Sequence, residues 1–290
     1  MNKTTDTLVD DIYAMMESKD ADPSVDVEAE IEKFGENVKA LMRTEFGREK
    51  RVDKRTLRLS NVGRTDRFLW NVVNGTKKEK IEPHTYVKFM YGHLVEELLL
   101  FLTRMSGHTV TDEQKQCEVE GIRGSMDCKI DGIVTDVKSA SSFGFKKFKE
   151  GKILRDDPFG YVDQIKAYAY SEGETQIGWL AIDKTVGHLT YLKYDLADPE
   201  FKVDMEFNGT IADRIKYLKE MVKKPEPVAV CHKPKPDGKS GNMQLAMGCS
   251  YCQYKQHCYP NLRLFNYSYQ PKYLCEVVKE PNVQELKLSD

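Results

Sequence analysis

Residues 124–138 read GSMDCKIDGIVTDVK, and this stretch predicts a β-hairpin around which the chain is organised. Asp131-Gly132 is a strong turn signal, because both central positions of a type I′ turn need φ > 0. A two-residue turn fixes the strand register. The expected cross-strand pairs are Ile130 with Ile133, Lys129 with Val134, Cys128 with Thr135, and Asp127 with Asp136.

Alternation along the strands predicts one charged and one apolar face for this hairpin. Asp127, Asp136 and Lys138 share the charged face. The apolar face carries Met126, Cys128, Ile130, Ile133 and Val137. Two carboxylates opposite each other lie about 5 Å apart at Cα and repel, so they favour a divalent cation such as Mg²⁺ or Mn²⁺. The alternative is a solvated strand face of mixed charge.

A helix preceding the hairpin contributes a further carboxylate. Pro83 fits a first-turn position, and the helix is expected to run from about His84 to Met105. Its part from Phe89 on is mostly apolar, which predicts burial. Glu96 lies four residues after Gly92, whose missing side chain would let a backbone or ligand approach closely. Either Glu96 meets a partner or a metal, or it marks a solvent stripe with Glu97.

Two segments following the hairpin have polar and aromatic side chains that suit a substrate cleft. Residues 139–157 predict a basic loop with a short helix, where phenylalanines alternate with lysines. These rings either stack on unpaired bases or anchor the loop to the core. Residues 160–171 predict a helix with Gln164 and Tyr168 on one face, which serve either a cleft or the core.

The order of the remaining elements predicts an α/β fold with a central mixed β-sheet flanked by helices. Further helices are expected at residues 1–22, 26–42, 60–73 (with Ser60 as N-cap) and 200–223. Strands are expected at residues 116–120, 122–130, 133–139, 176–183 and 188–194.

Composition places the chain among ordinary globular proteins. Its 290 residues carry a net charge of −2, and no apolar run is long enough to span a membrane. The polar, acidic N-terminus does not resemble a signal peptide, and seven cysteines without one predict a reducing, cytoplasmic location. Nucleic-acid binding would need local basic runs such as residues 48–58, 77–80 and 146–155, each of which is otherwise a solvated face.

Four cysteines near the C-terminus have the spacing of a metal site. Cys231, Cys249, Cys252 and Cys258 follow the pattern C-x17-C-x2-C-x5-C. A CxxC places two sulfurs on one tight turn, ready for Zn²⁺ or a [4Fe–4S] cluster. A disulfide pairing does not suit the expected compartment.

Five short motifs in this order resemble the PD-(D/E)xK nuclease superfamily, in particular RecB-type and lambda-exonuclease-type phage nucleases. They are G-x-x-x-E at 92–96, G-S-M-D at 124–127, D-V-K at 136–138, Q-x-x-x-Y at 164–168 and C-x2-C-x5-C at 249–258. The resemblance implies a restriction-endonuclease-like core with metal ligands Glu96, Asp127, Asp136 and the Val137 carbonyl. It also implies that Lys138 activates water, while Gln164 and Tyr168 shape the cleft.

The chain departs from the resembling proteins in two places. Iron–sulfur members have an N-terminal cysteine where this chain has Arg64-Thr65-Asp66-Arg67, so Cys231 becomes the expected fourth ligand and Zn²⁺ remains an alternative. RecB-type members have histidine where this chain has Glu96. DNA contacts are expected from Arg64, Arg67, Lys146 and Lys147.

The resemblance implies a Mg²⁺- or Mn²⁺-dependent exonuclease acting on DNA in phage recombination, replication or host-DNA breakdown. A single-strand-binding or annealing recombination protein is an expected partner, and no membrane is involved. The alternatives are a structure-selective or restriction-type endonuclease and a non-catalytic DNA- or partner-binding module. The expected parts are an N-terminal helical region at 1–58, a nuclease core at 59–224, a cysteine module at 225–265 and a tail at 266–290.

Overall fold

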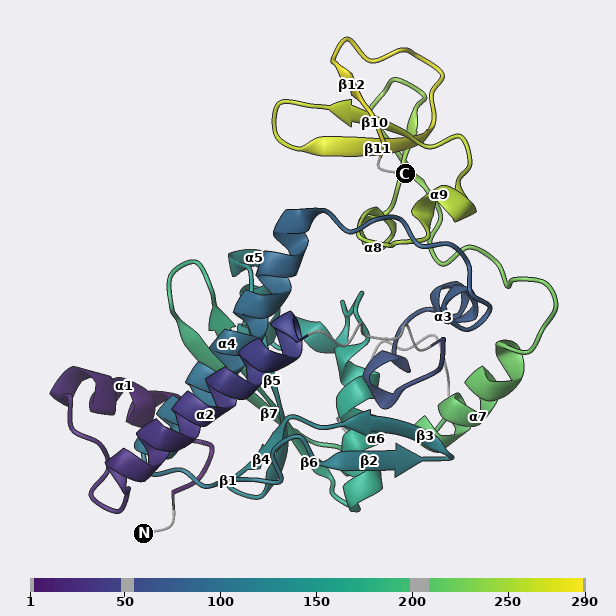
Figure 1. Ribbon diagram of the computed structural model, residues 1–290. Helices are drawn as coiled ribbons and strands as arrows, with labels where there is room; N and C mark the ends of the chain where they lie inside the picture. Colours follow the sequence, from purple (N-terminus) through teal and green to yellow (C-terminus); the bar gives the residue numbers. More distant parts are fainter. Residues whose placement is uncertain (1–2, 48–54, 199–208, 289–290) are drawn as a thin grey trace.

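A five-stranded mixed sheet forms the centre of the molecule in the computed structural model, which describes residues 3–47, 55–198 and 209–288 (Figure 1). The order is β1-β4-β5-β6-β7, where β5 and β6 are parallel and the other neighbours antiparallel. The strands are β1 Val110–Thr111, β4 Cys128–Ile130, β5 Ile133–Ala140, β6 Gln176–Asp183 and β7 Leu189–Asp195. The predicted α/β class with a mixed sheet is confirmed.

The hairpin β4–β5 has the predicted register for three pairs. Cys128 pairs with Thr135, Lys129 with Val134, and Ile130 with Ile133. Asp131 and Gly132 adopt φ values of 49° and 84°, as a type I′ turn requires. The fourth predicted pair is not part of the ladder, because β4 begins at Cys128 and Asp127 lies before it.

Apolar side chains cover both faces of the sheet. On one face, α1 (Leu8–Ser18) and α4 (Pro83–Met105) pack against Cys128, Ile130, Val137 and Leu180. On the other face, α5 (Ser142–Lys149) and α6 (Tyr161–Glu172) pack around Trp179 and Val134. Met126, expected beside Cys128, belongs to this second cluster, and regular strand alternation begins only at Cys128.

Helix α4 begins at Pro83 and ends at Met105, as predicted, but its N-terminal half is not buried. Tyr86, Phe89 and Tyr91 are 53%, 51% and 44% exposed. Only the later turns pack on the sheet, while α2 (Val27–Phe46) runs alongside α4 and packs the Phe34 ring against that of Phe101 at a tilt of 38° (Figure 1). The expectation that α4 is buried from Phe89 on is therefore wrong.

The segment before α4 differs from the predicted helix at residues 60–73. Ser60 is in a short 3-10 turn, η1 (Leu59–Asn61), rather than at a helix N-cap. The helix itself, α3 (Asp66–Val73), begins after Thr65 in the N-cap position. A second 3-10 turn, η2 (Lys152–Leu154), follows α5.

The predicted strand at 122–130 is divided between two sheets. Its first part is β3 (Ile122–Ser125), which pairs with β2 (Gln116–Val119) in a separate hairpin. The predicted helix at 200–223 is observed as α7 (Ile211–Met221), and residues 199–208 lie outside the described part. Residues 48–54 of the first basic run also lie outside it.

The C-terminal segment forms a second five-stranded sheet, drawn at the top of Figure 1, where the sequence predicts a tail. Its order is β12-β10-β11-β9-β8, with α8 (Met247–Ser250) and α9 (Lys255–Cys258) beside it. The strands are β8 Lys235–Pro236, β9 Met243–Gln244, β10 Arg263–Asn266, β11 Pro271–Glu276 and β12 Glu285–Leu286. Leu245, Cys249 and Leu262 form its small core.

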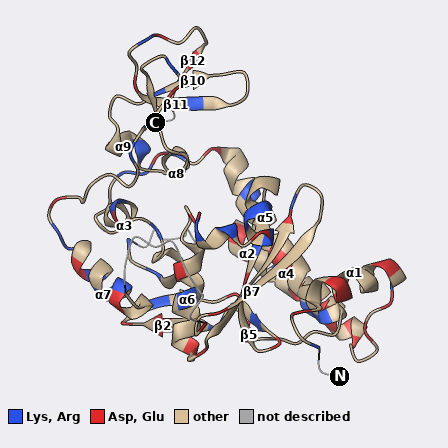
Figure 2. Cartoon of the chain, turned by 180° about the vertical axis from the view of Figure 1, so that it is seen from behind, with Lys and Arg blue, Asp and Glu red and all other residues tan. Residues whose placement is uncertain are grey.

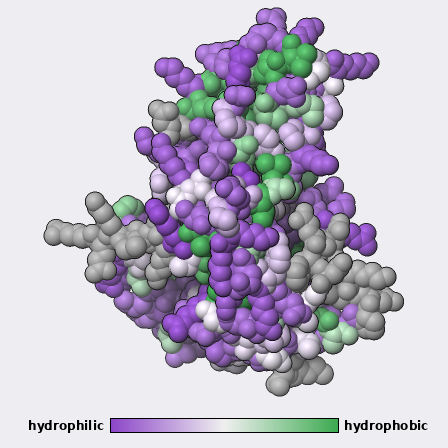
Figure 3. Space-filling model, turned by 90° about the vertical axis from the view of Figure 1, so that its right-hand side faces the viewer, coloured by the Kyte–Doolittle hydropathy of each residue, from purple (hydrophilic) through white to green (hydrophobic). Residues whose placement is uncertain are grey.

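No helix in the three described segments is long and apolar enough to cross a membrane. The face drawn in Figure 3 is mostly hydrophilic and carries several small apolar areas (Figure 3).

Candidate active site

Asp136 and Lys138 lie on β5, whose hydrogen-bonded neighbours on both sides keep it inside the sheet. Because side chains alternate, both residues face α6. The Asp136 side chain is buried, and its Oδ2 atom lies 2.6 Å from Lys138 Nζ. Burial in the centre of the sheet makes this ion pair less screened than a surface pair.

Asp127 reaches the same place by leaving the β-ladder. Its Oδ2 atom accepts a hydrogen bond of 2.9 Å from the backbone N–H of Val137. Its own carbonyl accepts from the backbone N–H of Gln114. The side chain thus takes over the role of a ladder carbonyl, which fixes its carboxylate next to Asp136.

Glu96 approaches these two carboxylates from α4. Burial, followed by the charge of Asp127, raises the pKa of Glu96 to about 8. Gln114 Nε2 donates to Glu96 Oε1 at 3.0 Å. Glu97 points elsewhere and accepts from Asn37 at 2.9 Å, so the two neighbouring glutamates do not form one solvent stripe.

The group carries more negative than positive charge. Burial raises the pKa of Asp136 to about 7, because it outweighs the attraction of Lys138, and the negative charge of Asp127 raises this pKa further. Burial lowers the pKa of Lys138, but the attraction of Asp136 and Asp127 outweighs it, and the net pKa is raised. Lys138 is therefore a fixed cation, while Asp136 and Glu96 tend to retain protons when nothing else neutralises them.

Helix α6 supports the carboxylates from the opposite side. Gln164 Nε2 donates to Asp136 Oδ1 at 3.2 Å. Tyr168 is 1% exposed, and its ring packs over Gly124, where an added Cβ would lie 3.2 Å from Tyr168 Cε1 and 2.6 Å from Leu59 Cβ. The close packing of Leu59 and Tyr168 thus leaves no room for a side chain at position 124. Tyr168 itself lies in the core and supports the site from there.

Tyr161 is a site residue that the sequence did not indicate. Its ring centroid lies 5.0 Å from Lys138 Nζ, a cation–π distance. Tyr161 precedes Gln164 by three residues, so both lie on one face of α6. That spacing is the signal from which it could have been found.

The carboxylates of Glu96, Asp127 and Asp136 are the oxygen donors that Mg²⁺ and Mn²⁺ prefer. Within the described segments, however, no three Asp, Glu, His or Cys side chains are already arranged as a metal site. The Val137 carbonyl, expected as a further ligand, lies 3.5 Å from Lys138 Nζ. The chemistry of the donor set fits a hard cation, and the side chains would have to close around it.

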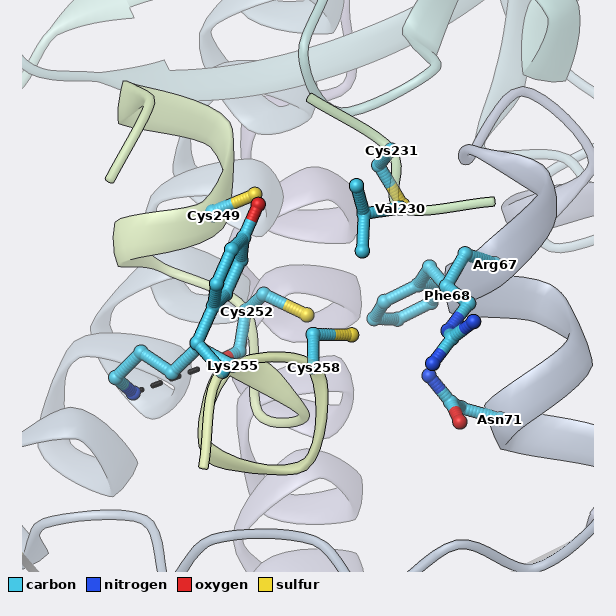
Figure 4. A pocket seen from close by; sticks show the side chains of 10 residues that line it. Arg67, Phe68, Asn71, Val230, Cys231, Cys249, Cys252, Lys255 and Cys258 are labelled. Atoms are coloured by element: carbon cyan, nitrogen blue, oxygen red, sulfur yellow. Dashed lines mark hydrogen bonds between the residues drawn. The ribbon is translucent and has the colours of Figure 1, made fainter. Parts of the chain in front are cut away.

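The four C-terminal cysteines line one pocket with α3 (Figure 4). Cys231, Cys249, Cys252 and Cys258 point into a cavity of about 20 Å³ whose other wall includes Arg67, Phe68 and Asn71. Thr65 donates from Oγ1 to Cys231 Sγ at 2.8 Å. Thr65, which comes just before α3, therefore lies beside the cysteines.

All seven cysteines are free thiols. Burial, followed by the proximity of Cys231, raises the pKa of Cys249 to about 12. Burial also raises the pKa of Cys252 and Cys258. Four convergent sulfurs are suitable donors for zinc or an iron–sulfur cluster.

The residues expected to contact DNA lie in different surroundings. Arg64 lines an open cleft, whereas Arg67 faces the cysteine pocket and donates to the Val228 carbonyl at 2.6 Å. Lys147 pairs with Asp156 at 2.7 Å, and Lys146 is exposed on α5, where Figure 2 shows the basic residues of this helix. Phe145 and Phe148 anchor α5 to the core, and Phe143 is 73% exposed.

Comparisons with known proteins give distant structural similarity only. No family model and no curated protein matches the chain. The crystal structure of SSO0001 is 13% identical, with a TM-score of 0.38, over 79% of this chain and 96% of that one. Structures of LHK-Exo, an alkaline exonuclease from Laribacter hongkongensis, are similar over 58–59% of this chain.

The LHK-Exo complex with dAMP is 14% identical, with 91% of its chain covered and a TM-score of 0.36. The second LHK-Exo structure is 15% identical, with 90% covered and a TM-score of 0.32. The structural neighbours of this chain thus include an exonuclease at low identity.

Proposed function

We propose that the chain is a metal-dependent deoxyribonuclease that hydrolyses phosphodiester bonds, and that it acts as an exonuclease. The observation that carries the proposal is the convergence of Glu96, Asp127, Asp136 and Lys138 at one end of the β4–β5 hairpin. Three carboxylates around a single fixed lysine suit phosphodiester hydrolysis better than they suit a stable core. The exonuclease mode rests on the resemblance of the motif order to phage exonucleases.

Glu96, Asp127 and Asp136 would hold Mg²⁺ or Mn²⁺. Such an ion, when bound, lowers the pKa of water and neutralises charge on phosphate oxygens. The raised pKa values of Glu96 and Asp136 support this assignment, because a nearby cation would remove the repulsion that keeps them protonated.

The remaining polar groups of the site have positioning roles. Lys138 presents a permanent positive charge beside Asp136, suited to orient a water molecule or to steady a phosphate oxygen. Gln164 holds the Asp136 carboxylate through its Oδ1 atom. Tyr161 lies against Lys138 and limits the directions in which the ammonium group can point.

The cysteine pocket is proposed to hold a structural [4Fe–4S] cluster or Zn²⁺. Cys231, Cys249, Cys252 and Cys258 supply the thiolates, and Thr65 would donate a hydrogen bond to the Cys231 sulfur. Bound there, the group would fasten the C-terminal sheet to α3. Iron and zinc are separated by elemental analysis and by visible absorbance, which only the iron–sulfur cluster shows.

End-labelled linear DNA and circular DNA of the same sequence, each single- and double-stranded, test the proposed activity with Mg²⁺ or Mn²⁺. We expect release of nucleotides from linear DNA, dependence on the metal, and resistance of circular DNA. Cleavage of circles as readily as linear molecules would point to an endonuclease. Absence of cleavage on every substrate would favour a non-catalytic module.

A further inference from the structure

A second cleft lies between the central sheet and the C-terminal segment. Its volume is about 770 Å³, and its walls come from the start of α3, the α5–α6 connection and residues around α8. None of its described lining residues belongs to the set Glu96, Asp127, Asp136 and Lys138. The cleft therefore requires its own explanation.

The cations of this cleft outnumber the acids that could neutralise them. Arg64, Arg155, Lys233 and Lys235 line it, and none has an acidic partner among the described residues. The other two cations are occupied, because Lys147 pairs with Asp156 at 2.7 Å and Arg214 pairs with Asp66 at 2.7 Å.

Each of the two other acids in the wall has a partner within the protein. Asp157 accepts the backbone N–H groups of Phe159, Gly160 and Val162 at 3.2, 2.8 and 2.8 Å. Asp163 Oδ1 lies 3.6 Å from Lys166 Nζ in an ion pair, without a hydrogen bond among the described residues. The cleft thus presents unpaired positive charge, which attracts a polyanion.

Exposed aromatic rings accompany these cations. Phe159 lies between two lining residues, Pro158 and Gly160, and is 39% exposed. The Arg64 guanidinium carbon lies 5.6 Å from its ring centroid, and Tyr251, 68% exposed, lies 6.5 Å from the same ring. Alternating aromatic rings and cations are the pattern that binds single strands, because every unpaired base has a face on which a ring can stack.

A row of rings leads from this cleft to the acidic site. Phe159 lies 5.6 Å from Tyr161, and Tyr161 lies 5.0 Å from Lys138 Nζ. Gly160 begins α6 against Gly63, where an added Cβ on Gly63 would lie 2.3 Å from the Gly160 carbonyl oxygen. This close contact holds the cleft wall and the helix that carries Gln164 in a fixed relation.

We propose that the cleft binds a single strand of DNA, with phosphates on Arg64, Arg155, Lys233 and Lys235 and bases on Phe159 and Tyr251, and leads it to the acidic site. The inference deepens the proposed function and rests on it for the destination of the strand. Binding itself needs no catalysis, so it can be measured separately.

The charge part of the proposal is tested by fluorescence anisotropy with a labelled thymidine oligonucleotide, in buffer without added divalent cations. The variant Lys233→Ala/Lys235→Ala should bind roughly tenfold more weakly and should lower the slope of log K against log salt by about 1.4. The control Lys279→Ala/Lys287→Ala removes the same charge from exposed lysines outside the cleft. Equal affinities and slopes for the two double variants would overturn the proposal.

The stacking part is tested with Tyr251→Ala, which should weaken binding at least about fivefold. Tyr269→Ala is the matched control, since Tyr269 is 98% exposed on the β10–β11 connection, whereas Tyr251 lies 6.5 Å from the Phe159 ring. Single-stranded DNA should bind more tightly than duplex of the same length. If the two tyrosine variants bind equally, or if poly-glutamate competes as well as the oligonucleotide, the cleft is a general docking surface for polyanions and the proposal is wrong.

The outcome of the cleavage assay does not decide these binding experiments. Weakened binding in both cleft variants, together with a wild-type chain that cleaves nothing, would keep the strand-binding cleft and reject the nuclease. Normal binding in the cleft variants, together with metal-dependent cleavage by the wild type, would keep the nuclease and reject the cleft.

Discussion

Asp127 Oδ2 accepts the backbone N–H of Val137, although the hairpin that joins the two residues ends its regular ladder at Cys128. This hydrogen bond places a carboxylate beside Asp136 at the point where a strand would otherwise continue. The two acids are therefore held together by backbone geometry, and their repulsion is not relieved by moving apart. We therefore expect the repulsion between these carboxylates to lower the free energy of unfolding, as is common at sites that serve a reaction.

The first prediction concerns the pH dependence of stability in metal-free protein. The pKa values of about 8 for Glu96 and about 7 for Asp136 lie above the ordinary values of 4.5 and 3.8. Between these limits the folded state binds more protons than the unfolded state, so the free energy of unfolding falls as pH rises. The slope is up to about 1.4 kcal/mol per pH unit for each proton.

Denaturant unfolding at several pH values between 5 and about 8 checks this slope. The variant Glu96→Gln/Asp136→Asn should lose most of it, and added Mg²⁺ should flatten it in the wild type. A wild-type stability that rises with pH more steeply than that of the variant would contradict the charge balance described for the site.

The second prediction concerns Gly92, the first residue of the G-x-x-x-E motif. An added Cβ there would meet only Ser139 Oγ, at 3.6 Å, so the fold has room for it. Gly92→Ala should raise the free energy of unfolding by about 0.5–1 kcal/mol, because glycine is unfavourable inside a helix. If a substrate strand passes over α4 at this point, the same variant should cleave DNA more slowly.

Gly35→Ala is the matched control, because Gly35 lies within α2 and an added Cβ meets no described atom within 4 Å. It should gain similar stability with unchanged cleavage. Unchanged cleavage in Gly92→Ala as well would show that the glycine does not serve the substrate.

The third prediction concerns Gly63, whose backbone touches that of Gly160. A Cβ at Gly63 would lie 2.3 Å from the Gly160 carbonyl oxygen, and Gly160 has a φ of 79°. Gly63→Ala should lower the free energy of unfolding by at least about 2 kcal/mol and should displace the start of α6. The effect is measured by thermal unfolding, with Gly35→Ala as the control. A Gly63→Ala variant as stable as the wild type would refute the contact.

The fourth prediction concerns the cysteine pocket. Cys252→Ser should reduce the bound iron or zinc and lower the melting temperature, because the proposed metal group would fasten the C-terminal sheet to α3. Cys275→Ser is the control, since Cys275 lies on β11 and does not line the pocket. The prediction is checked by measuring iron and zinc in anaerobically purified protein. Equal metal content in the two variants, or no metal in either, would reject the assignment of the pocket as a metal site.

Local patterns predicted those parts of the fold that depend on local chemistry. Asp131-Gly132 determined the hairpin register, because few residue pairs tolerate positive φ at both positions. Pro83 marked the start of α4, and the strand predicted at residues 176–183 coincides with β6. The position of Gln164 beside Asp136 agrees with the predicted helix face.

Contacts between distant segments could not be predicted in this way. Thr65 and Cys231 are 166 positions apart, and their hydrogen bond depends on how α3 packs. The C-terminal sheet was missed because three of its strands, β8, β9 and β12, have two residues each and show no alternation. Asp127 was assigned to a regular strand, since nothing in the sequence shows that its side chain replaces a backbone acceptor.

The central claim is that Lys138 and its three carboxylates hydrolyse phosphodiester bonds, and it is tested most directly by comparing Lys138→Met with Lys129→Met. Both lysines lie on the same hairpin, but Lys129 pairs with Glu172 and Glu174 outside the site. Release of nucleotides from end-labelled linear DNA with Mg²⁺ should fall at least about 100-fold in Lys138→Met and stay near wild type in Lys129→Met. Equal cleavage by Lys138→Met and the wild type would contradict the account.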